Sequence, residues 1–135
     1  MKTNDLYRIA ERDGITVHRF LLSNNKSVSL CMDEKLFVGL DGKLDGADEK
    51  VCLAHELGHC ETMSFYNLYS PCDVRGKHER RANIWAIKKL IPKAKYFWAL
   101  RHGYDNIYSL AEYFGVTPEF INKTAEYYGK QKAHI

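Results

Sequence analysis

The segment HELGH at residues 55–59 constrains this chain more than any other feature of its sequence. Two histidines four residues apart lie on the same face of an α-helix, with Cβ atoms about 5–6 Å apart. Val51, Leu53 and Ala54 precede the segment, as expected for a buried helix. A helix that carries His55 and His59 in this way predicts two neighbouring corners of a tetrahedral metal site.

Two further residues of the segment have predicted roles. Glu56 follows the first histidine, so its carboxylate points beside the metal and not at it. There it can take a proton from water activated at the metal, which predicts hydrolysis with Glu56 as catalytic base. Gly58 has no side chain, so another backbone can approach this turn of the helix closely.

A catalytic metal site needs a third protein ligand and an open fourth position. Glu79, twenty residues after His59, is the candidate that the sequence favours. His78 is its main rival, but the His78 ring would project about 100° away from the face that carries Glu79. That face continues at helical spacing through small and apolar residues, namely Ala82, Asn83, Ala86 and Leu90.

The small residues of this face have two expected consequences. Ala82 and Ala86 would let their helix pack tightly against the turn at Gly58 and bring Glu79 to the metal. Asn83, one helical turn further, could orient a ligand or a backbone group from outside the metal's own ligand set.

The chain is predicted to fold as α, then β, then α, in an α+β architecture. A first helix around Leu6–Asp13, with Thr3 or Asn4 as cap, should stop at Gly14. Three strands with turns at Asn24-Asn25 and Asp33-Glu34 should form a small antiparallel sheet with one wet face, over residues 15–22, 27–32 and 36–40. Helices should follow at residues 45–60, 78–90, 96–101, 106–114 and 117–128, with a loop over 63–77.

With 135 residues, the chain is expected to form one domain. Residues 1–45 should form the first helix and the sheet, 46–92 the metal-binding helices, and 93–135 the C-terminal helices. The composition excludes a disordered or fibrous protein. The first residues show no secretion signal and no apolar run reaches about 20 residues, so a cytoplasmic location without membrane contact is expected.

Cysteines and charges add less specific information. Cys31, Cys52, Cys60 and Cys72 have no close CxxC spacing, so they are interpreted as free thiols, with Cys72 as a possible modulator of the metal. Between Arg75 and Lys95 there are eight basic residues and one acid, Glu79. Such a run is usually a solvated helix face, and the alternative is attraction of an acidic partner.

Several motifs together resemble the ImmA/IrrE family of metallopeptidases. They are AHELGH at 54–59, ERRAN at 79–83, LIP at 90–92 and the closing LAEYFGV at 110–116. The likeness extends to the opening helix and strands and so covers most of the chain. It implies a gluzincin-like fold, a metal held by His55, His59 and Glu79, and Glu56 as the catalytic residue.

The resemblance also implies a substrate and a metal. The substrate class is helix-turn-helix repressors of prophages, integrative elements or stress regulons, which are inactivated by cleavage. The chain is similar to the compact, mobile-element type of the family, because it has no large C-terminal sensor domain. Zn²⁺ is the expected metal, with Mn²⁺ or another divalent ion as alternatives.

Two other functions remain open on the sequence. Ala111, Gly115, Val116 and Ile121 are spaced as in a DNA-binding helix-turn-helix. The second helix would present Pro118, Glu119 and Glu126 among its groove-facing residues, which disfavours direct binding to nucleic acid. Leu110, Phe114, Phe120 and Ile121 are more simply interpreted as core. The second alternative is a protein-interaction module with a structural metal, although structural sites usually have four protein ligands.

The expected mechanism also needs a side chain to stabilise the oxyanion and a surface to hold the substrate. Tyr66, Tyr69 and His102 are the candidates for the oxyanion, and the sequence does not rank them. An exposed strand edge beside the cleft is expected to bind the substrate in extended form, as an added strand.

Overall fold

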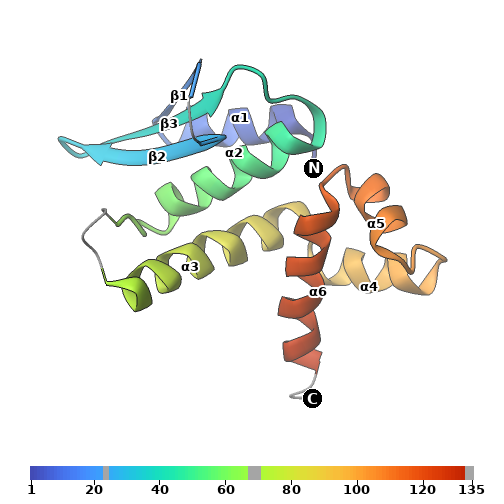
Figure 1. The fold of residues 1–135 in the computed structure, drawn as a ribbon. Helices are drawn as coiled ribbons and strands as arrows, with labels where there is room; N and C mark the ends of the chain where they lie inside the picture. The colour runs from blue at the N-terminus through green and yellow to red at the C-terminus, as the bar shows by residue number, and fades with distance from the viewer. Residues whose placement is uncertain (23–24, 67–70, 133–135) are drawn as a thin grey trace.

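The computed structural model describes residues 1–22, 25–66 and 71–132, without the side chains of 130–132. This part of the chain forms helices α1 to α6 and a sheet of strands β1 to β3, which confirms the α+β class (Figure 1). The bounds are α1 Thr3–Arg12, β1 Ile15–Phe20, β2 Ser27–Met32, β3 Lys35–Asp41, α2 Gly46–Glu61, α3 Cys72–Leu90, α4 Lys93–Arg101, α5 Ile107–Phe114 and α6 Pro118–Lys132.

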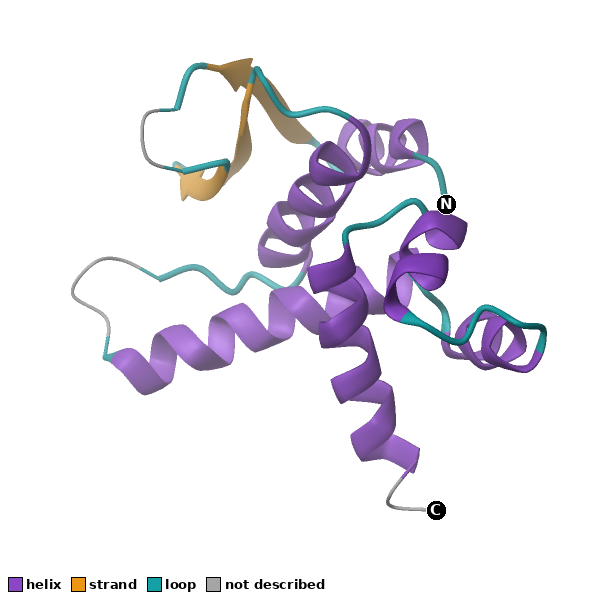
Figure 2. Cartoon of the chain, turned by 45° about the vertical axis from the view of Figure 1, so that its right-hand side comes forward, coloured by secondary structure: helices purple, strands orange, loops and turns teal. Residues whose placement is uncertain are grey.

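Helix α2 lies at the centre of the fold. It contacts α1, β2 and β3 on one side and α3 on the other (Figure 1). Its buried residues run almost without interruption from Leu53 to Cys60 and lie on all sides of the helix. A helix that is buried all round belongs in an interior, so the predicted buried stretch is confirmed. Figure 2 shows the sheet grouped at one end of the molecule and α4, α5 and α6 away from it.

The sheet is mixed, with strand order β1-β3-β2. The prediction of an all-antiparallel sheet is therefore wrong for one pair: β1 runs parallel to β3, with Ile15 opposite Leu36. β2 and β3 are antiparallel, as expected. β3 carries the most buried strand residues, Val38 and Leu40, with 1% and 0% of their surface exposed. Because β3 is the central strand, both of its edges are paired, and β2 is an outer strand of the sheet.

The turns of the sheet are partly as predicted. Asp33 and Glu34 join β2 to β3 with φ angles of 51° and 64°. Two positive φ angles in a two-residue loop match the twist of a β-hairpin, and Asp and Asn tolerate them best among residues with a side chain. The other predicted turn includes Asn24, which lies outside the described residues. β1 ends at Phe20, two residues earlier than expected.

Two helices begin earlier than predicted, in both cases directly after a proline. α3 starts at Cys72, so the loop expected over 63–77 is shorter, and α4 starts at Lys93 instead of Tyr96. Pro71 and Pro92 occupy the N-cap positions with φ of −57° and −56°. Proline presets φ for a helix start and needs no amide hydrogen there. Pro71 and Pro92 therefore mark the starts of α3 and α4, and Pro92 also follows the end of α3.

The helix caps show the same mixture of agreement and difference. The N-cap of α1 is Lys2, not Thr3 or Asn4, and the Lys2 amide donates to the Asp5 carboxylate over 2.9 Å. Thr117 caps α6 as predicted, because its hydroxyl oxygen accepts the amide of Phe120 over 3.2 Å. No helix in the described residues is long and apolar enough to cross a membrane.

Gly58 of α2 and Ala82 of α3 are in direct backbone contact. A Cβ atom added at Gly58 would lie 2.5 Å from the Ala82 carbonyl oxygen and 3.0 Å from its Cα. Ala82 and Ala86 are fully buried, with no exposed surface. The predicted close packing of the small-residue face of α3 on the Gly58 turn is therefore confirmed.

This contact leads to a stability prediction. Gly58→Ala should lower the free energy of unfolding by about 1–3 kcal/mol, because the new methyl group pushes the two helix backbones apart. Gly76→Ala is the matched control, since Gly76 is also helical and nothing lies within 4 Å of an added Cβ. It should raise stability by about 0.5–1 kcal/mol through helix propensity. Urea unfolding of both variants measures the difference, and equal stability of the two would refute the packing argument.

Candidate metal centre

Three potential metal ligands converge between α2 and α3. His55 and His59 come from adjacent turns of α2, and Glu79 comes from α3, whose close approach at Gly58 brings it within reach. Their ligand atoms all lie within 4.8 Å of one another. Within the described ranges this is the one group of three metal-ligating side chains so placed. The juxtaposition predicted from the sequence is therefore present.

The distances within this triad fit one small cation. The two Nε2 atoms are 3.2 Å apart, and the Glu79 oxygens lie 2.9 Å from His59 Nε2 and 3.0 Å from His55 Nε2. Ligands at about 2.05 Å from a tetrahedral zinc ion are about 3.3 Å from each other. His59 Nε2 contacts Oε1 of Glu79 and His55 Nε2 contacts Oε2, so the carboxylate lies across both nitrogens at spacings close to those around such an ion.

Hydrogen bonds on the far side of each imidazole fix which nitrogen faces the centre. His59 Nδ1 lies 2.6 Å from the carbonyl oxygen of Ser64, and His55 Nδ1 lies 2.9 Å from Oδ1 of Asn83. A carbonyl oxygen only accepts, so each Nδ1 carries the hydrogen. In the neutral rings both Nε2 atoms then present lone pairs to the carboxylate of Glu79. Three acceptors aimed at one point form a site for a cation.

The orienting partners differ in how the sequence could reveal them. Asn83 was predicted as an orienting residue from its place one turn after Glu79, and the structure confirms its contact with His55. Ser64 was missed. It acts through its backbone carbonyl, beyond the end of α2 and after Met63, whose φ is 50°. A backbone group carries no residue-type signal, so this role of Ser64 could not be predicted from the sequence.

The electrostatics of the triad are those of a paired acid and base. When their Nε2 atoms are also protonated, His55 and His59 donate hydrogen bonds to Glu79, and these hold the pKa of its carboxyl group well below the ordinary value. Burial lowers the pKa of His59, but its hydrogen bonds to Glu79 and Ser64 outweigh that effect, so the pKa is raised overall. The same field that favours a proton on His59 favours a metal cation between the three groups.

Glu56 lies beside the triad and not in it, as expected. Only 7% of its surface is exposed, and it lines a cleft of about 350 Å³ together with the triad. The Ser27 hydroxyl donates to Glu56 Oε2 over 2.6 Å. This bond uses one carboxylate oxygen, and no hydrogen bond joins the other to a residue of the described ranges. The sequence did not reveal Ser27, because it is 29 residues away and its role depends on the sheet order.

The cleft is bordered by β2, the outer strand of the sheet. Ser27, Val28 and Ser29 of β2 line it, together with Phe65 and Tyr66 from the segment after α2. β2 pairs with β3 along one edge only, among the strands of the described residues. Its second edge thus carries backbone donors and acceptors without strand partners. The strand edge expected beside the cleft is present.

The structure separates the three candidates for oxyanion stabilisation. The Tyr66 hydroxyl donates to Glu79 Oε1 over 2.8 Å, and its ring lies 6.1 Å from that of His59. His102 lies at the end of α4, stacked on Trp98 at 4.0 Å, and is not among the residues that line the cleft. Tyr69 lies outside the described residues. Tyr66 is therefore the candidate that the structure places at the triad.

His78, the rival third ligand, has a different environment. Its ring stacks on that of Tyr66, with centroids 6.2 Å apart and an interplanar angle of 25°. Its Nδ1 atom is buried and has no hydrogen-bond partner among the described residues. His78 is not part of the triad. The structure therefore gives His78 a stacking contact with Tyr66 and not a place among the three grouped ligands.

The cysteines are free thiols, as predicted. Cys60 is buried, and burial raises the pKa of its thiol to about 12, so it is inert. Burial also raises the pKa of Cys52. Cys72 is exposed and begins α3, and it is not among the residues of the triad.

The apolar residues of the C-terminal helices α5 and α6 pack into the hydrophobic core. α5 ends at Phe114, and its C-cap Gly115, with a φ of 68°, makes the turn toward α6. The residues interpreted as core are all at least 90% buried, namely Leu110, Phe114, Phe120 and Ile121. The Tyr128 hydroxyl donates to the Ile91 carbonyl over 2.6 Å and ties α6 to the end of α3. Packing therefore explains the apolar pattern of this segment.

Comparison with known proteins agrees with this geometry. The sequence profile of the Peptidase_M78 family, described as the IrrE N-terminal-like domain, matches residues 10–126 of the 135-residue chain. The matched region begins in α1, ends in α6 and contains the whole triad and Glu56. A search of curated proteins gives no match. The family match confirms the resemblance seen in the sequence and supports a metallopeptidase-type function.

Proposed function

Since the chain belongs to the Peptidase_M78 family of IrrE N-terminal-like domains, we propose that it is a metal-dependent endopeptidase. His55, His59 and Glu79 are the proposed metal ligands, and Glu56 is the proposed catalytic base. The observation that carries the proposal is the convergence of three lone-pair-bearing atoms beside a nearly buried carboxylate that lines the same cleft.

The ligand set also suggests the metal. Two imidazole nitrogens and one carboxylate, with a position open toward the cleft, are the usual set for catalytic zinc. We therefore propose Zn²⁺, with Mn²⁺ or another divalent ion as alternatives. When bound, the metal polarises the scissile carbonyl group and lowers the pKa of the attacking water.

The protein's own residues would divide the remaining work. Glu56 accepts the proton of the attacking water and later passes it to the leaving amine. Ser27 holds one Glu56 oxygen by its 2.6 Å hydrogen bond, so the other oxygen keeps a fixed direction. Tyr66 has its hydroxyl 2.8 Å from Glu79, and it is the proposed donor to the oxyanion.

The outer edge of β2 is the proposed substrate surface. An extended peptide would add to this edge by backbone hydrogen bonds, as a further strand of the sheet. The scissile bond would then lie over the triad, because Ser27, Val28 and Ser29 line the same cleft as His55 and Glu56. A cleft of about 350 Å³ holds a few residues of a peptide and not a folded domain. The substrate must therefore present an extended segment.

The proposed substrate is a helix-turn-helix repressor, cleaved at one or two bonds. Family membership supports this class. The location would be the cytoplasm, where such repressors act. Eight basic residues between Arg75 and Lys95, on α3 and the start of α4, would attract an acidic linker of the repressor toward the cleft. Recognition would come mainly from docking of the folded part of the substrate.

The first prediction of this proposal concerns the metal ligands. Glu79→Ala should lose most of the bound metal, because two imidazoles alone hold it weakly. Asn83→Ala should weaken affinity by about 10- to 100-fold, since it removes only an orienting partner. His78→Ala should keep the metal content of the parent protein. Elemental analysis and chelator competition measure this order, and loss of metal in His78→Ala with retention in Glu79→Ala would reassign the third ligand.

The second prediction concerns the base. Glu56→Gln should keep the metal and the fold but lose about 10²- to 10⁴-fold in peptidase rate, because an amide keeps the shape and cannot accept the proton. Glu61→Gln, at the end of the same helix and outside the cleft, is the control and should cleave normally. Single-turnover cleavage assays measure both. Parent-like cleavage by Glu56→Gln would exclude it as the base.

The third prediction concerns the substrate. The protein should cut a helix-turn-helix repressor encoded near it at one or two bonds and should leave unfolded casein intact. Mass spectrometry of both digestions, with and without a chelator, measures this selectivity. Chelator-sensitive digestion of casein with an intact repressor would contradict the proposed substrate while leaving the peptidase assignment in place.

A further inference from the structure

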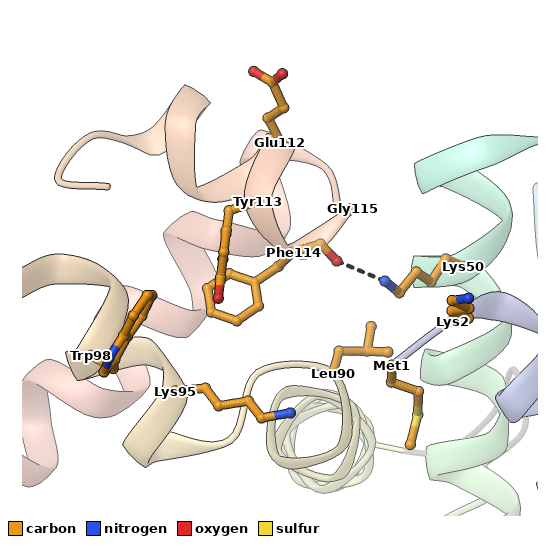
Figure 3. A pocket seen from close by; sticks show the side chains of 10 residues that line it. All are labelled: Met1, Lys2, Lys50, Leu90, Lys95, Trp98, Glu112, Tyr113, Phe114 and Gly115. Carbon is orange, nitrogen blue, oxygen red and sulfur yellow. Dashed lines mark hydrogen bonds between the residues drawn. The ribbon is translucent and has the colours of Figure 1, made fainter. Parts of the chain in front are cut away.

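A second cavity, larger than the metal cleft, lies where α2, α4 and α5 meet beside the first residues of the chain (Figure 3). Its volume is about 540 Å³, and it shares no lining residue with the cleft at the triad. Of the residues given a role above, only Lys95, the last residue of the basic run from Arg75, also lines it. A volume of this size is typical of a site for a small molecule.

The cavity gathers three lysine side chains, and the carboxylate that acts on Lys50 is that of Asp5, in the first turn of α1 and outside the lining. Lys2, Lys50 and Lys95 line it, and none of them forms an ion pair with a carboxylate of the described residues. Glu112 is the one acid among the lining residues, and Figure 3 shows its carboxylate turned away from the lysines. An electropositive hollow of this kind attracts a small anion with more than one charge.

Lys50 is buried in this cavity, unlike the lysines of an ordinary solvent-exposed surface. Only 7% of its surface is exposed, and burial lowers the pKa of its ammonium group. Its Nζ donates to the Phe114 carbonyl oxygen over 2.6 Å, which ties α2 to the last turn of α5 (Figure 3). An ammonium group has three hydrogens to donate. In the described part of the chain, no other acceptor bonds to it, so two hydrogens remain for a ligand.

The other walls of the cavity are apolar. Leu90 forms part of one side, and Trp98, Tyr113 and Phe114 form another. Trp98 and Tyr113 have 42% and 45% of their surface exposed, although large aromatic side chains are usually better covered. An occupant with an anionic end and an apolar or ring-shaped body would complement both parts of the site.

We propose that this cavity binds a small phosphate-bearing molecule, with its phosphate on Lys50 and Lys95 and its organic part against Trp98 and Tyr113. A phosphate group carries nearly two negative charges and three acceptor oxygens, which match two ammonium groups better than one carboxylate does. Lys50 is on α2, five residues before His55, so the ligand contacts the helix that carries both histidines. The binding site itself does not depend on the peptidase assignment.

Titration calorimetry on the full chain tests this proposal, with AMP, inorganic pyrophosphate and a hexaglutamate peptide as probes. Trp98 fluorescence provides a second readout, since Trp98 lines the cavity. We expect saturable binding of AMP, weakened by salt. Lys95→Gln should weaken it about tenfold or more. Lys93→Gln, on the same helix but not lining the cavity, should bind like the parent protein.

Lys50→Met tests the buried charge, and a thermal melt shows whether that variant is folded. The proposal predicts weaker AMP binding by folded Lys50→Met as well as by Lys95→Gln. Absence of saturable binding of AMP and pyrophosphate up to about 10 mM would overturn it, as would equal affinities of Lys95→Gln and Lys93→Gln. Tighter binding of hexaglutamate than of both phosphate probes would also overturn it and would make the cavity a docking site for acidic protein segments.

Discussion

The backbones of α2 and α3 touch at Gly58 and Ala82, where an added Cβ would come within 2.5 Å of a carbonyl oxygen. The candidate metal centre depends on this contact. The two histidines lie on α2 and the glutamate lies on α3, so the distance between the helices sets the distance between the ligands. Residues without bulky side chains at the crossing bring the ligand atoms to about 3 Å from one another. A larger residue at Gly58 would separate the ligands without changing any of them.

Residues around the triad orient the side chains that the packing of α2 on α3 brings together. Asn83 and Ser64 accept hydrogen bonds from the Nδ1 atoms of His55 and His59, respectively. The Nε2 atoms of both rings therefore face the centre of the triad. The sheet contributes in the same way, because Ser27 of β2 fixes the carboxylate of Glu56. The three layers of sheet, α2 and α3 thus each supply one part of the site. The candidate metal centre is therefore assembled from neighbouring elements of one small fold.

The sequence was sufficient to predict those features that depend on local spacing. The HELGH segment was enough to predict a buried helix with His55 and His59 on one face. The small residues on one face of α3 were enough to predict the close packing of α3 on α2 and the position of Glu79. Asn83 followed from the same helical spacing. What could not be predicted depends on the order of elements in space. The parallel pairing of β1 with β3 moves β2 to the outside, and only then can Ser27 reach Glu56. The start of α3 was predicted too late, because Pro71 also serves as a helix start.

The two helices of the site differ in how firmly they are held. In α2, buried residues extend from Lys50 to Cys60, whereas the buried residues of α3 begin only at Ala82, three residues after Glu79. Local opening of a structure begins where few buried contacts oppose it. The amide hydrogens around the histidines should therefore exchange with solvent only when the whole domain unfolds, and those of residues 72–81 should exchange more often. His55 and His59 should therefore leave their positions only on global unfolding. Glu79 should leave its position as often as the N-terminal end of α3 frays.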